Sequence, residues 1–333
     1  MYIGDIREVC EVLWPPKKLL VGLDPVHDGS VLVERAAELG RRFGATIILF
    51  DCVQNQYVSR RYFRDGHALN HARQTLVKGH RDRLERLAQR MIVGNLSVIV
   101  DATWDAPLDD GLIRAASRHD ADWILVGIGY HRIPRLPFLA STDGSLIRQA
   151  TCPLLLVQQR PWSSPPRIVS AIDPLHSHGK PEDLDRRILE AGACICRHGG
   201  GHLYVFHAFE SILRAEGGDA LEPLPVEYAE ATLEGAHNAA VEALLEDLPE
   251  TAGNVRIAEG RPEEKLPLFA EEVRADVVII GAVTRSPWQR IFIGSTAEKV
   301  LDRLASDILI IKPEGFLGSV ETAPLHSQVR GPG

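Results

Sequence analysis

The chain carries the same sequence pattern twice, and this internal repeat is the feature that most restricts its fold. ADWILVG (Ala121–Gly127) aligns with ADVVIIG (Ala275–Gly281), and FLASTDGSLIRQATCPLLLV (Phe138–Val157) aligns without a gap with FIGSTAEKVLDRLASDILII (Phe292–Ile311). A repeat that spans about half of a chain indicates a duplicated domain, because solenoid repeats are only about 20–45 residues long. The sequence therefore predicts two domains of the same fold.

The second copy of this repeat has the order strand, loop, helix, strand. Asp276–Ile280 and Asp307–Ile311 are short apolar runs rich in β-branched residues, which is typical of buried strands. Between them, Gly294-Ser295-Thr296 begins a helix. Across each half the expected elements alternate as β-α-β-α-β-α-β-α-β. Such alternation predicts an α/β fold in which helices cover both faces of an open parallel sheet.

Length and linker composition give the expected domain boundaries. A chain of 333 residues is too long for one core of ordinary size. The Pro- and Ser-rich run Arg160–Pro166 is typical of a linker. We expect a leader helix at 1–16, a first domain at 17–158, a linker at 159–166, a second domain at 167–313 and a flexible tail at 314–333.

Charge and composition argue against several classes of partner. The net charge is −8, whereas nucleic acids and anionic membranes are bound by basic surfaces. No apolar run is long enough to span a bilayer, and the N-terminus lacks the apolar core of a signal peptide. The five cysteines are an odd number without framework spacing. We therefore expect a cytoplasmic protein with reduced thiols that binds neither nucleic acid nor membrane.

The expected ligand site lies at the carboxyl ends of the strands in the second half. Ligands of open parallel sheets bind where the winding direction reverses, between the first strand and a later one. Asp173 ends the first strand of this half and Gly281 ends the fourth. A carboxylate there can accept hydrogen bonds from ribose hydroxyls or a base amine. The helix that begins at Gly294-Ser295-Thr296 offers free backbone N–H groups to phosphates.

The spacing of small residues in this half resembles that of the nucleotide-binding universal stress proteins. Their pattern G-x2-G-x9-G-[S/T], after a first strand that ends in Asp, reads here Gly281-x2-Thr284-x9-Gly294-Ser295. With the tandem arrangement and the FIGSTAEKV…LIIKP ending, residues 17–313 look most like the two-domain E type of that family.

The resemblance implies two tandem adenine-nucleotide-hydrolase-like domains, each an open five-stranded sheet of strand order 3-2-1-4-5. It implies that Asp173 holds the ribose or base of ATP or a related nucleotide. The Gly281 backbone and the Gly294-Ser295-Thr296 turn would hold the phosphates. Arg285 would clamp phosphates beside them; the alternative is a solvated loop arginine.

The two halves depart from the family pattern to different degrees. Thr284 stands where the second glycine is expected, and its side chain either crowds a phosphate or donates a hydrogen bond to one. In the first half the matching positions are Gly127, Tyr130, Ala140 and Ser141, and Asp143 lies in the first turn of the next helix. A carboxylate suits a helix N-terminus but repels a phosphate there. We therefore expect nucleotide binding in the second half only.

Two groups of residues raise the alternative of a metal site. Asp173, His176 and His178 are imidazole and carboxylate groups of the kind that bind zinc, although a solvated loop explains them as well. Cys194-x-Cys196-x-His198 has metal-binding residue types, but positions i and i+2 of a helix point to different faces. Zinc is therefore the weaker expectation for a cofactor.

Structural roles alone also explain the turn residues of the second half. Gly281 and Gly294 can simply shape turns, and Ser295 with Glu298 has the S-x-x-E spacing of a capping box. We find no serine-histidine-aspartate elbow, HExxH motif or P-loop lysine. The sequence thus favours a stress-response protein regulated by a bound nucleotide, with at most slow hydrolysis. The alternatives are a module for another, possibly lipid-like ligand and a zinc-binding protein.

The last strand of each half suggests how the domains assemble. Leu154–Val157 and Ile308–Ile311 are apolar throughout, and in the family that the chain resembles the last strand pairs with that of a partner. Pairing these strands within one chain would hide both edges. We expect an intramolecular pseudo-dimer of domains, and a further homodimer is compatible with it.

Overall fold

The structure is a computed structural model that describes most of the two halves. The described residues are 14–24, 29–55, 57–58, 65–92, 94–105, 107–128, 142–175, 183–210, 226–246, 248, 254–282, 295–314 and 316. Within α6, α8 and α10, the side chains of residues 142–143, 226–232 and 295–298 are excluded from this description. Nearly all of the expected leader helix and tail falls outside the described ranges.

The first half alternates strands and helices along the chain. Apolar runs form the strands, and helices with one apolar face connect them. The elements are β1 (Lys18–Gly22), α2 (Ser30–Phe43), β2 (Thr46–Val53), α4 (Gly66–Ile92), β3 (Val98–Trp104), α5 (Leu108–His119), β4 (Trp123–Gly127), α6 (Thr142–Gln149) and β5 (Leu154–Val157).

The second half repeats this order. Its elements are β6 (Arg167–Ala171), α7 (Asp183–Gly199), β7 (His202–Phe209), α8 (Val226–Leu245), β8 (Val255–Glu259), α9 (Pro262–Glu272), β9 (Val277–Gly281), α10 (Ser295–Arg303) and β10 (Asp307–Ile311). Strand β9 begins one residue later than the run Asp276–Ile280 predicts. The Asp276 carboxylate instead binds the backbone at the start of the neighbouring strand β6.

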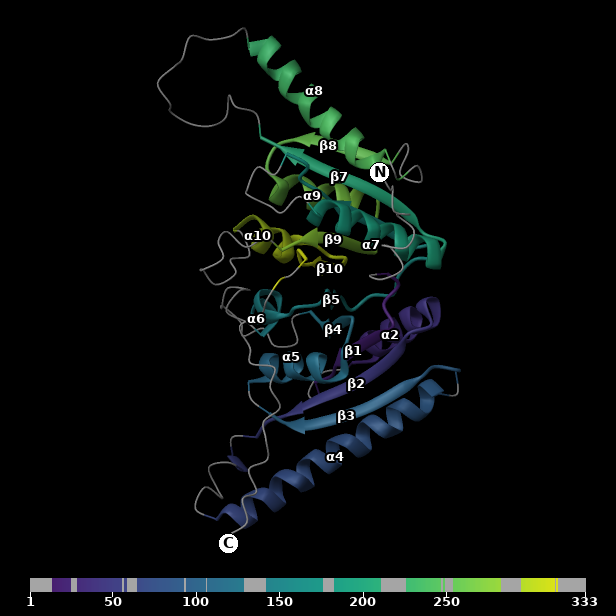
Figure 1. Ribbon diagram of the computed structural model, residues 1–333, viewed down its shortest axis with the longest axis vertical. Helices are drawn as coiled ribbons and strands as arrows, with labels where there is room; N and C mark the ends of the chain where they lie inside the picture. The colour runs from purple at the N-terminus through teal and green to yellow at the C-terminus, as the bar shows by residue number, and fades with distance from the viewer. Residues whose placement is uncertain are drawn as a thin grey trace, which may run out of the picture.

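All strands join one ten-stranded sheet of order β3-β2-β1-β4-β5-β10-β9-β6-β7-β8. Neighbouring strands are parallel within each half, and each half has the strand order 3-2-1-4-5. The halves meet where β10 pairs antiparallel with β5, with Leu309 opposite Leu155. Figure 1 shows the two halves stacked along the long axis of the molecule, with β5 and β10 at its centre.

Helices cover both faces of this sheet, and each face has its own apolar cluster. Side chains alternate along the strands, so that Leu19 and Val21 point into one cluster and Leu20 into the other. Each cluster takes residues from both halves, which makes the core continuous across the β5–β10 pair. The first face buries Leu32 of α2, Leu84 of α4, Ile188 of α7 and Val241 of α8; the second buries Leu112 of α5, Leu146 of α6, Leu266 of α9 and Val300 of α10.

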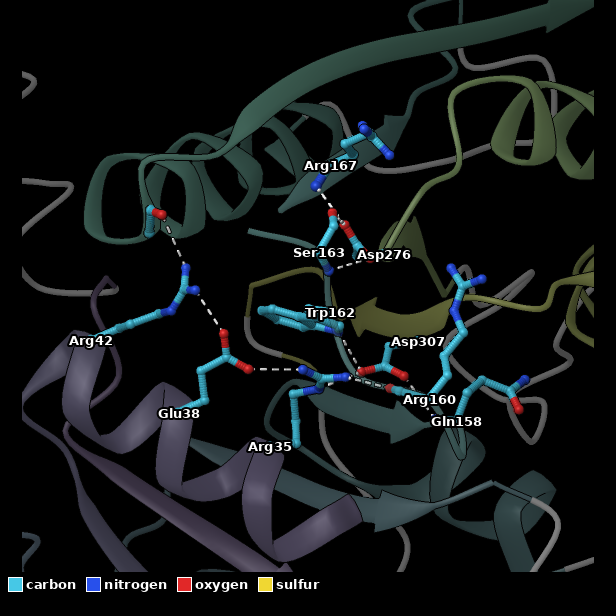
Figure 2. A network of polar contacts seen from close by, with 11 residues as sticks. Arg35, Glu38, Arg42, Gln158, Arg160, Trp162, Ser163, Arg167, Asp276 and Asp307 are labelled. Atoms are coloured by element: carbon cyan, nitrogen blue, oxygen red, sulfur yellow. Dashed lines mark hydrogen bonds and ion pairs between the residues drawn. The ribbon is translucent and has the colours of Figure 1, made fainter. Parts of the chain in front are cut away.

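A buried polar network joins the halves beside the β5–β10 pair (Figure 2). Arg35 Nε donates to Asp307 Oδ2 at 2.8 Å, and the two side chains are 2% and 0% exposed. The same carboxylate accepts the backbone N–H of Gln158 at 2.7 Å and the indole N–H of Trp162 at 2.8 Å. The Arg35 guanidinium also lies 4.1 Å from the centre of the Trp162 ring. The Asp307 carboxylate of the second half therefore contacts both the first half and the linker.

Burial raises the pKa of Asp307 to about 6, whereas the neighbouring Arg35 and the two N–H donors favour the charged form. The carboxylate is therefore ionised at neutral pH. A second carboxylate, Asp276, accepts the backbone N–H groups of Ser163 at 2.9 Å and Arg167 at 2.8 Å, and also the Ser163 hydroxyl. These contacts fix the middle of the linker and the residue that follows it to the second half.

Candidate functional site

The candidate nucleotide site begins where β6 ends. The backbone N–H of Ile172 donates to the Phe206 carbonyl at 2.9 Å, which continues the β6–β7 pairing by one residue. The next N–H, that of Asp173, donates to Asp185 Oδ1 in the first turn of α7 at 3.0 Å. The buried Asp185 carboxylate thus holds the chain at the point where the Asp173 side chain leaves the sheet.

The site's second strand, β9, lies next to β6. Ser170 is opposite Ile279, so that the carboxyl ends of both strands reach the same end of the sheet. Gly281 is the last residue of β9, and the N–H of Ala282 still donates to Ile311 of β10 at 2.9 Å. Asp173 and Gly281 therefore follow adjacent strands on the same side, which is the placement that the sequence predicts.

The glycine at position 281 has a packing role. A Cβ atom at Gly281 would lie 2.7 Å from Leu184 Cδ2 and 3.2 Å from Ile188 Cδ1. Real Cβ atoms hardly ever come closer than about 3 Å to such a neighbour, so α7 can sit this close to β9 only because the side chain is missing. The glycine is thus explained by helix–sheet packing, whether or not its backbone also contacts a ligand.

Several predicted site residues are outside the described ranges. These are Thr284, Arg285, Gly294, His176 and His178. Ser295 and Thr296 form the start of α10 in the backbone, but their side chains are not described. The helix begins where the sequence predicts it to begin, and its first N–H groups carry the partial positive charge that attracts anions.

A buried histidine pair lies beside this region, and the sequence patterns did not identify it. His207 of β7 and His237 of α8 are 1% and 5% exposed. His207 Nε2 and His237 Nδ1 are 2.8 Å apart, and His207 Nδ1 lies 3.0 Å from the carbonyl oxygen of Ile172. The His237 ring stacks on Phe209 with their centres 4.5 Å apart. The pair therefore anchors α8 to the residue that precedes Asp173.

Burial lowers the pKa of His237, and the neighbouring His207 lowers it further. Asp173 acts in the opposite direction, because its negative charge favours protonated His237. The His237 imidazole is therefore neutral at pH 7. Asp173 is close enough to His237 for their charges to interact, which connects the histidine pair to the candidate ligand site.

The first half has a polar pair at the matching position. Asp51 of β2 is fully buried, and its Oδ2 lies 2.7 Å from His80 Nδ1 and 3.0 Å from the Arg83 guanidinium, both on α4. Asp51 follows Phe50 just as His207 follows Phe206. Aligning the two second strands would have revealed the correspondence, because each has one polar residue near the end of an apolar run.

The structure gives limited support to the metal alternatives. Within the described ranges, no group of three or more His, Cys, Asp or Glu side chains is arranged to hold a metal. His198 Nδ1 lies 2.9 Å from the Cys194 carbonyl oxygen and 3.6 Å from its sulfur, a contact within one helical turn. The possible zinc site of Asp173, His176 and His178 includes two residues outside those ranges, so it stays a prediction.

No helix in the described parts of the chain is both long and apolar enough to cross a membrane.

Comparisons with known proteins agree with the observed architecture. The model of the universal stress protein family matches residues 16–158 and 166–312. Universal stress protein E of Escherichia coli K12 is 24% identical over 310 residues, which cover 92% of this chain and 96% of that protein. The Universal stress protein E homolog of Haemophilus influenzae is 28% identical over 172 residues, covering 51% of this chain and 55% of that protein.

Solved structures show the same fold. A protein of unknown function from Pseudomonas aeruginosa PAO1 superposes with a TM-score of 0.68 at 22% identity, covering 91% of this chain and 95% of that one. A universal stress protein from Archaeoglobus fulgidus DSM 4304 gives a TM-score of 0.57 at 17% identity, covering 91% and 97%. Since the family model matches both halves of the sheet, the chain belongs to the universal stress protein family and carries two of its domains in tandem.

Proposed function

We propose that this protein acts in the cytoplasm as a stress-response regulator whose second domain binds ATP or a related nucleotide. The observation that carries the proposal is the convergence of Asp173, the end of β9 and the start of α10 at one end of the second half of the sheet. This is the place where open parallel sheets bind their ligands.

The chemistry of these groups suits the two ends of a nucleotide. The Asp173 carboxylate can accept hydrogen bonds from ribose hydroxyls or a base amine. The free N–H groups of α10 can bind phosphate oxygens, and in this proposal the Arg285 guanidinium and the Thr284 hydroxyl also donate to them. Such a site works by binding alone: the ligand stabilises one conformation of the protein over another. The nucleotide is therefore a regulatory ligand in this proposal.

The first half is proposed to bind no nucleotide. Asp143 is the second residue of α6, the helix that matches α10. A carboxylate in the first turn of a helix repels a phosphate at that helix N-terminus electrostatically. One nucleotide per chain is therefore expected, although each chain has two domains.

Calorimetric titration of the full chain with ATP tests this assignment. We expect one site per chain, weakened about tenfold or more by Asp173→Ala, because a hydrogen bond to a charged group contributes about 1.5–3 kcal/mol. Asp24→Ala is the matched control, since Asp24 precedes Pro25 at the same point of the first half. Equal affinities of Asp173→Ala and the unmodified protein would show that Asp173 does not contact the nucleotide.

Native mass spectrometry of the purified chain decides between ligand classes. One copurified nucleotide per chain would support the proposal, with Ser295→Ala reducing its occupancy. A lipid-like metabolite in its place would favour the alternative that the phosphate-binding turn has been lost. Stoichiometric zinc would instead point to Asp173 with His176 and His178.

The tandem chain is also proposed to be a built-in pseudo-dimer. The β5–β10 pairing uses the edge strand of each half, so neither strand is left to recruit a second chain. A homodimer of the protein would therefore have to form through another surface.

A further inference from the structure

In each half of the molecule, a buried polar residue on the second strand contacts a histidine of the long helix at the same structural position. In the first half this contact joins Asp51 on β2 to His80 on α4, at 2.7 Å. In the second half it joins His207 on β7 to His237 on α8, at 2.8 Å. Leu23 N–H bonds to Phe50 and Ile172 N–H bonds to Phe206 in the same way, so the two strand positions are equivalent.

The two contacts respond differently when a histidine takes up a proton. His207 Nδ1 faces the Ile172 carbonyl, which only accepts, so this nitrogen carries a hydrogen. In the neutral pair, Nε2 of His207 is then the acceptor and Nδ1 of His237 is the donor. A proton on His237 Nε2 preserves this contact but leaves a buried cation. A proton on His207 Nε2 destroys it, because two N–H groups would face each other at 2.8 Å.

The first-half contact behaves in the opposite way. A carboxylate is only an acceptor when ionised, so His80 Nδ1 must be the donor. Protonation of the other His80 nitrogen leaves this N–H in place and converts the contact into an ion pair with Asp51. The Arg83 guanidinium, 3.0 Å from the same carboxylate oxygen, already supplies positive charge there. Acid therefore leaves the anchor of α4 intact.

We propose that mild acidification selectively releases α8 from the second domain, while α4 stays docked through Asp51 and His80. A proton added to the His207–His237 pair either leaves a buried cation or makes two N–H groups face each other, and release of α8 relieves both. This regulatory response is independent of the proposed nucleotide, since it needs only the apo chain.

The way α8 packs makes this contact decisive. Among the described side chains of α8, only His237 and Val241 are buried. By comparison, α4 buries Leu84, Ala88 and Met91 in addition to its polar contact. Loss of the histidine contact therefore leaves Val241 as the one buried side chain in the described part of α8, supported by the partly buried Leu244 and Leu245.

The carboxylates around the pair favour its protonation, but they do not outweigh its burial. His207 comes from β7 and His237 from α8, and both are enclosed by apolar neighbours such as Phe209. Asp173, from the segment after β6, favours a first proton on His237. Asp185 of α7 binds the Asp173 backbone N–H and adds a further buried carboxylate nearby. Even so, burial keeps the pKa of His237 below its usual value. The protein with α8 packed on the sheet therefore binds fewer protons than the protein with α8 released.

Hydrogen exchange measured by mass spectrometry on the full apo chain between pH 8 and pH 5.5 tests the proposal. After correction for the intrinsic pH dependence of exchange, we expect the open fraction of α8 to rise below pH ~6.5. The rise should reach about tenfold per pH unit for each proton taken up. Peptides from α4 serve as the internal reference and should keep their protection. Parallel behaviour of the two helices, or constant protection of α8, would overturn the proposal.

A single substitution can give the second half the chemistry of the first. His207→Asp places a carboxylate opposite His237, as Asp51 stands opposite His80, and should remove the acid-induced opening of α8. If circular dichroism shows that His207→Asp does not fold, His237→Asn takes its place, since its amide can still donate to His207 Nε2 without titrating. Persistence of the full acid response in the folded variant would rule out the histidine pair as its source.

Discussion

Lys312, the residue after β10, buries a charged group in the boundary between the halves. Its side chain is 1% exposed, its ammonium donates to the Ile147 carbonyl of α6, and it lies 4.5 Å from the centre of the Phe316 ring. Burial, together with the nearby Arg148, lowers the pKa of Lys312 to about 7. This lysine therefore loses its proton some three pH units earlier than a lysine in water would.

The low pKa of Lys312 predicts a pH-dependent stability. Between pH 7 and pH 10.5 the unfolded chain holds this proton and the folded chain does not, so the free energy of unfolding rises with pH in that window. Below pH 7 both states are protonated, and the full cost of burying the charge is present. Lys312→Met should therefore stabilise the protein at pH 7 by roughly 2–4 kcal/mol and remove up to about 1.4 kcal/mol per pH unit of the rise.

Urea unfolding of both proteins at pH 7, 8, 9 and 10 measures this difference. Taking the difference between the two proteins cancels the titration of all other lysines and tyrosines. Equal pH slopes for Lys312→Met and the unmodified protein would show that Lys312 keeps an ordinary pKa in the fold.

Single residues are also where prediction from the sequence reached its limit. Asp307 stands at the start of an apolar run, and nothing in that run indicates its partner Arg35, 272 positions earlier in the chain. His207 and His237 are isolated histidines in an apolar strand and a helix, and only the angle at which α8 docks brings them together. Contacts of this kind depend on three-dimensional packing, for which no local pattern exists.

Elements, by contrast, follow from local patterns. The apolar runs Leu154–Val157 and Asp307–Ile311 form the strands β5 and β10. The strand β9 and the start of α10 at Ser295 lie where the repeat places them, because hydrophobic periodicity and capping act over short distances. The candidate site was predictable to the same extent, since strand ends and helix starts define it.

The contact between β9 and α7 gives a prediction at this scale. In Gly281→Ala the new methyl group would meet Leu184 Cδ2 at 2.7 Å, so α7 must shift or Leu184 must change rotamer. We expect destabilisation by about 1–3 kcal/mol in the absence of ligand, which is typical of overpacking. Thermal or urea unfolding of the apo protein measures it.

Leu184→Val provides the matched control for that experiment. It removes the crowding methyl group, so Gly281→Ala should cost less in this background than alone, giving a favourable coupling energy in a double-mutant cycle. Strict additivity of the two substitutions would mean that Gly281 faces open space in solution.

At the scale of the whole molecule, the two domains share one sheet and two continuous apolar clusters. The Arg35–Asp307 ion pair lies at their junction, together with Trp162 of the linker. Because both charges are buried, removing one partner leaves the other without compensation. The junction is therefore the point where a single substitution should affect both halves.

Arg35→Met should destabilise the protein by about 3–5 kcal/mol at pH 8, because it leaves the Asp307 carboxylate buried without its cation. The loss should be smaller at pH 5, where Asp307 can take up a proton, since removing Arg35 raises a pKa that is already about 6. Urea unfolding at the two pH values gives the comparison.

The double variant Arg35→Met/Asp307→Leu separates the charge effect from a general packing defect. Replacing both partners of a buried pair by apolar residues is often nearly neutral, so most of the lost stability should return. A double variant as unstable as Arg35→Met would assign the loss to packing around Trp162 and Arg160 and not to the unpaired carboxylate.

The linker that joins β5 to β6 also breaks the symmetry of the molecule. In a dimer of identical chains, every substitution appears in both subunits. A buried charge added by a substitution therefore needs a residue of opposite charge beside it in each subunit. In one covalent chain, a single residue of opposite charge is enough. Asp307 stands at the position that Pro153 occupies in the other copy of the repeat, so one Arg35–Asp307 pair satisfies the added charge. The same freedom lets Asp51 and His207 hold equivalent positions with opposite responses to acid. Fusion of the two domains thus allowed each copy to specialise on its own.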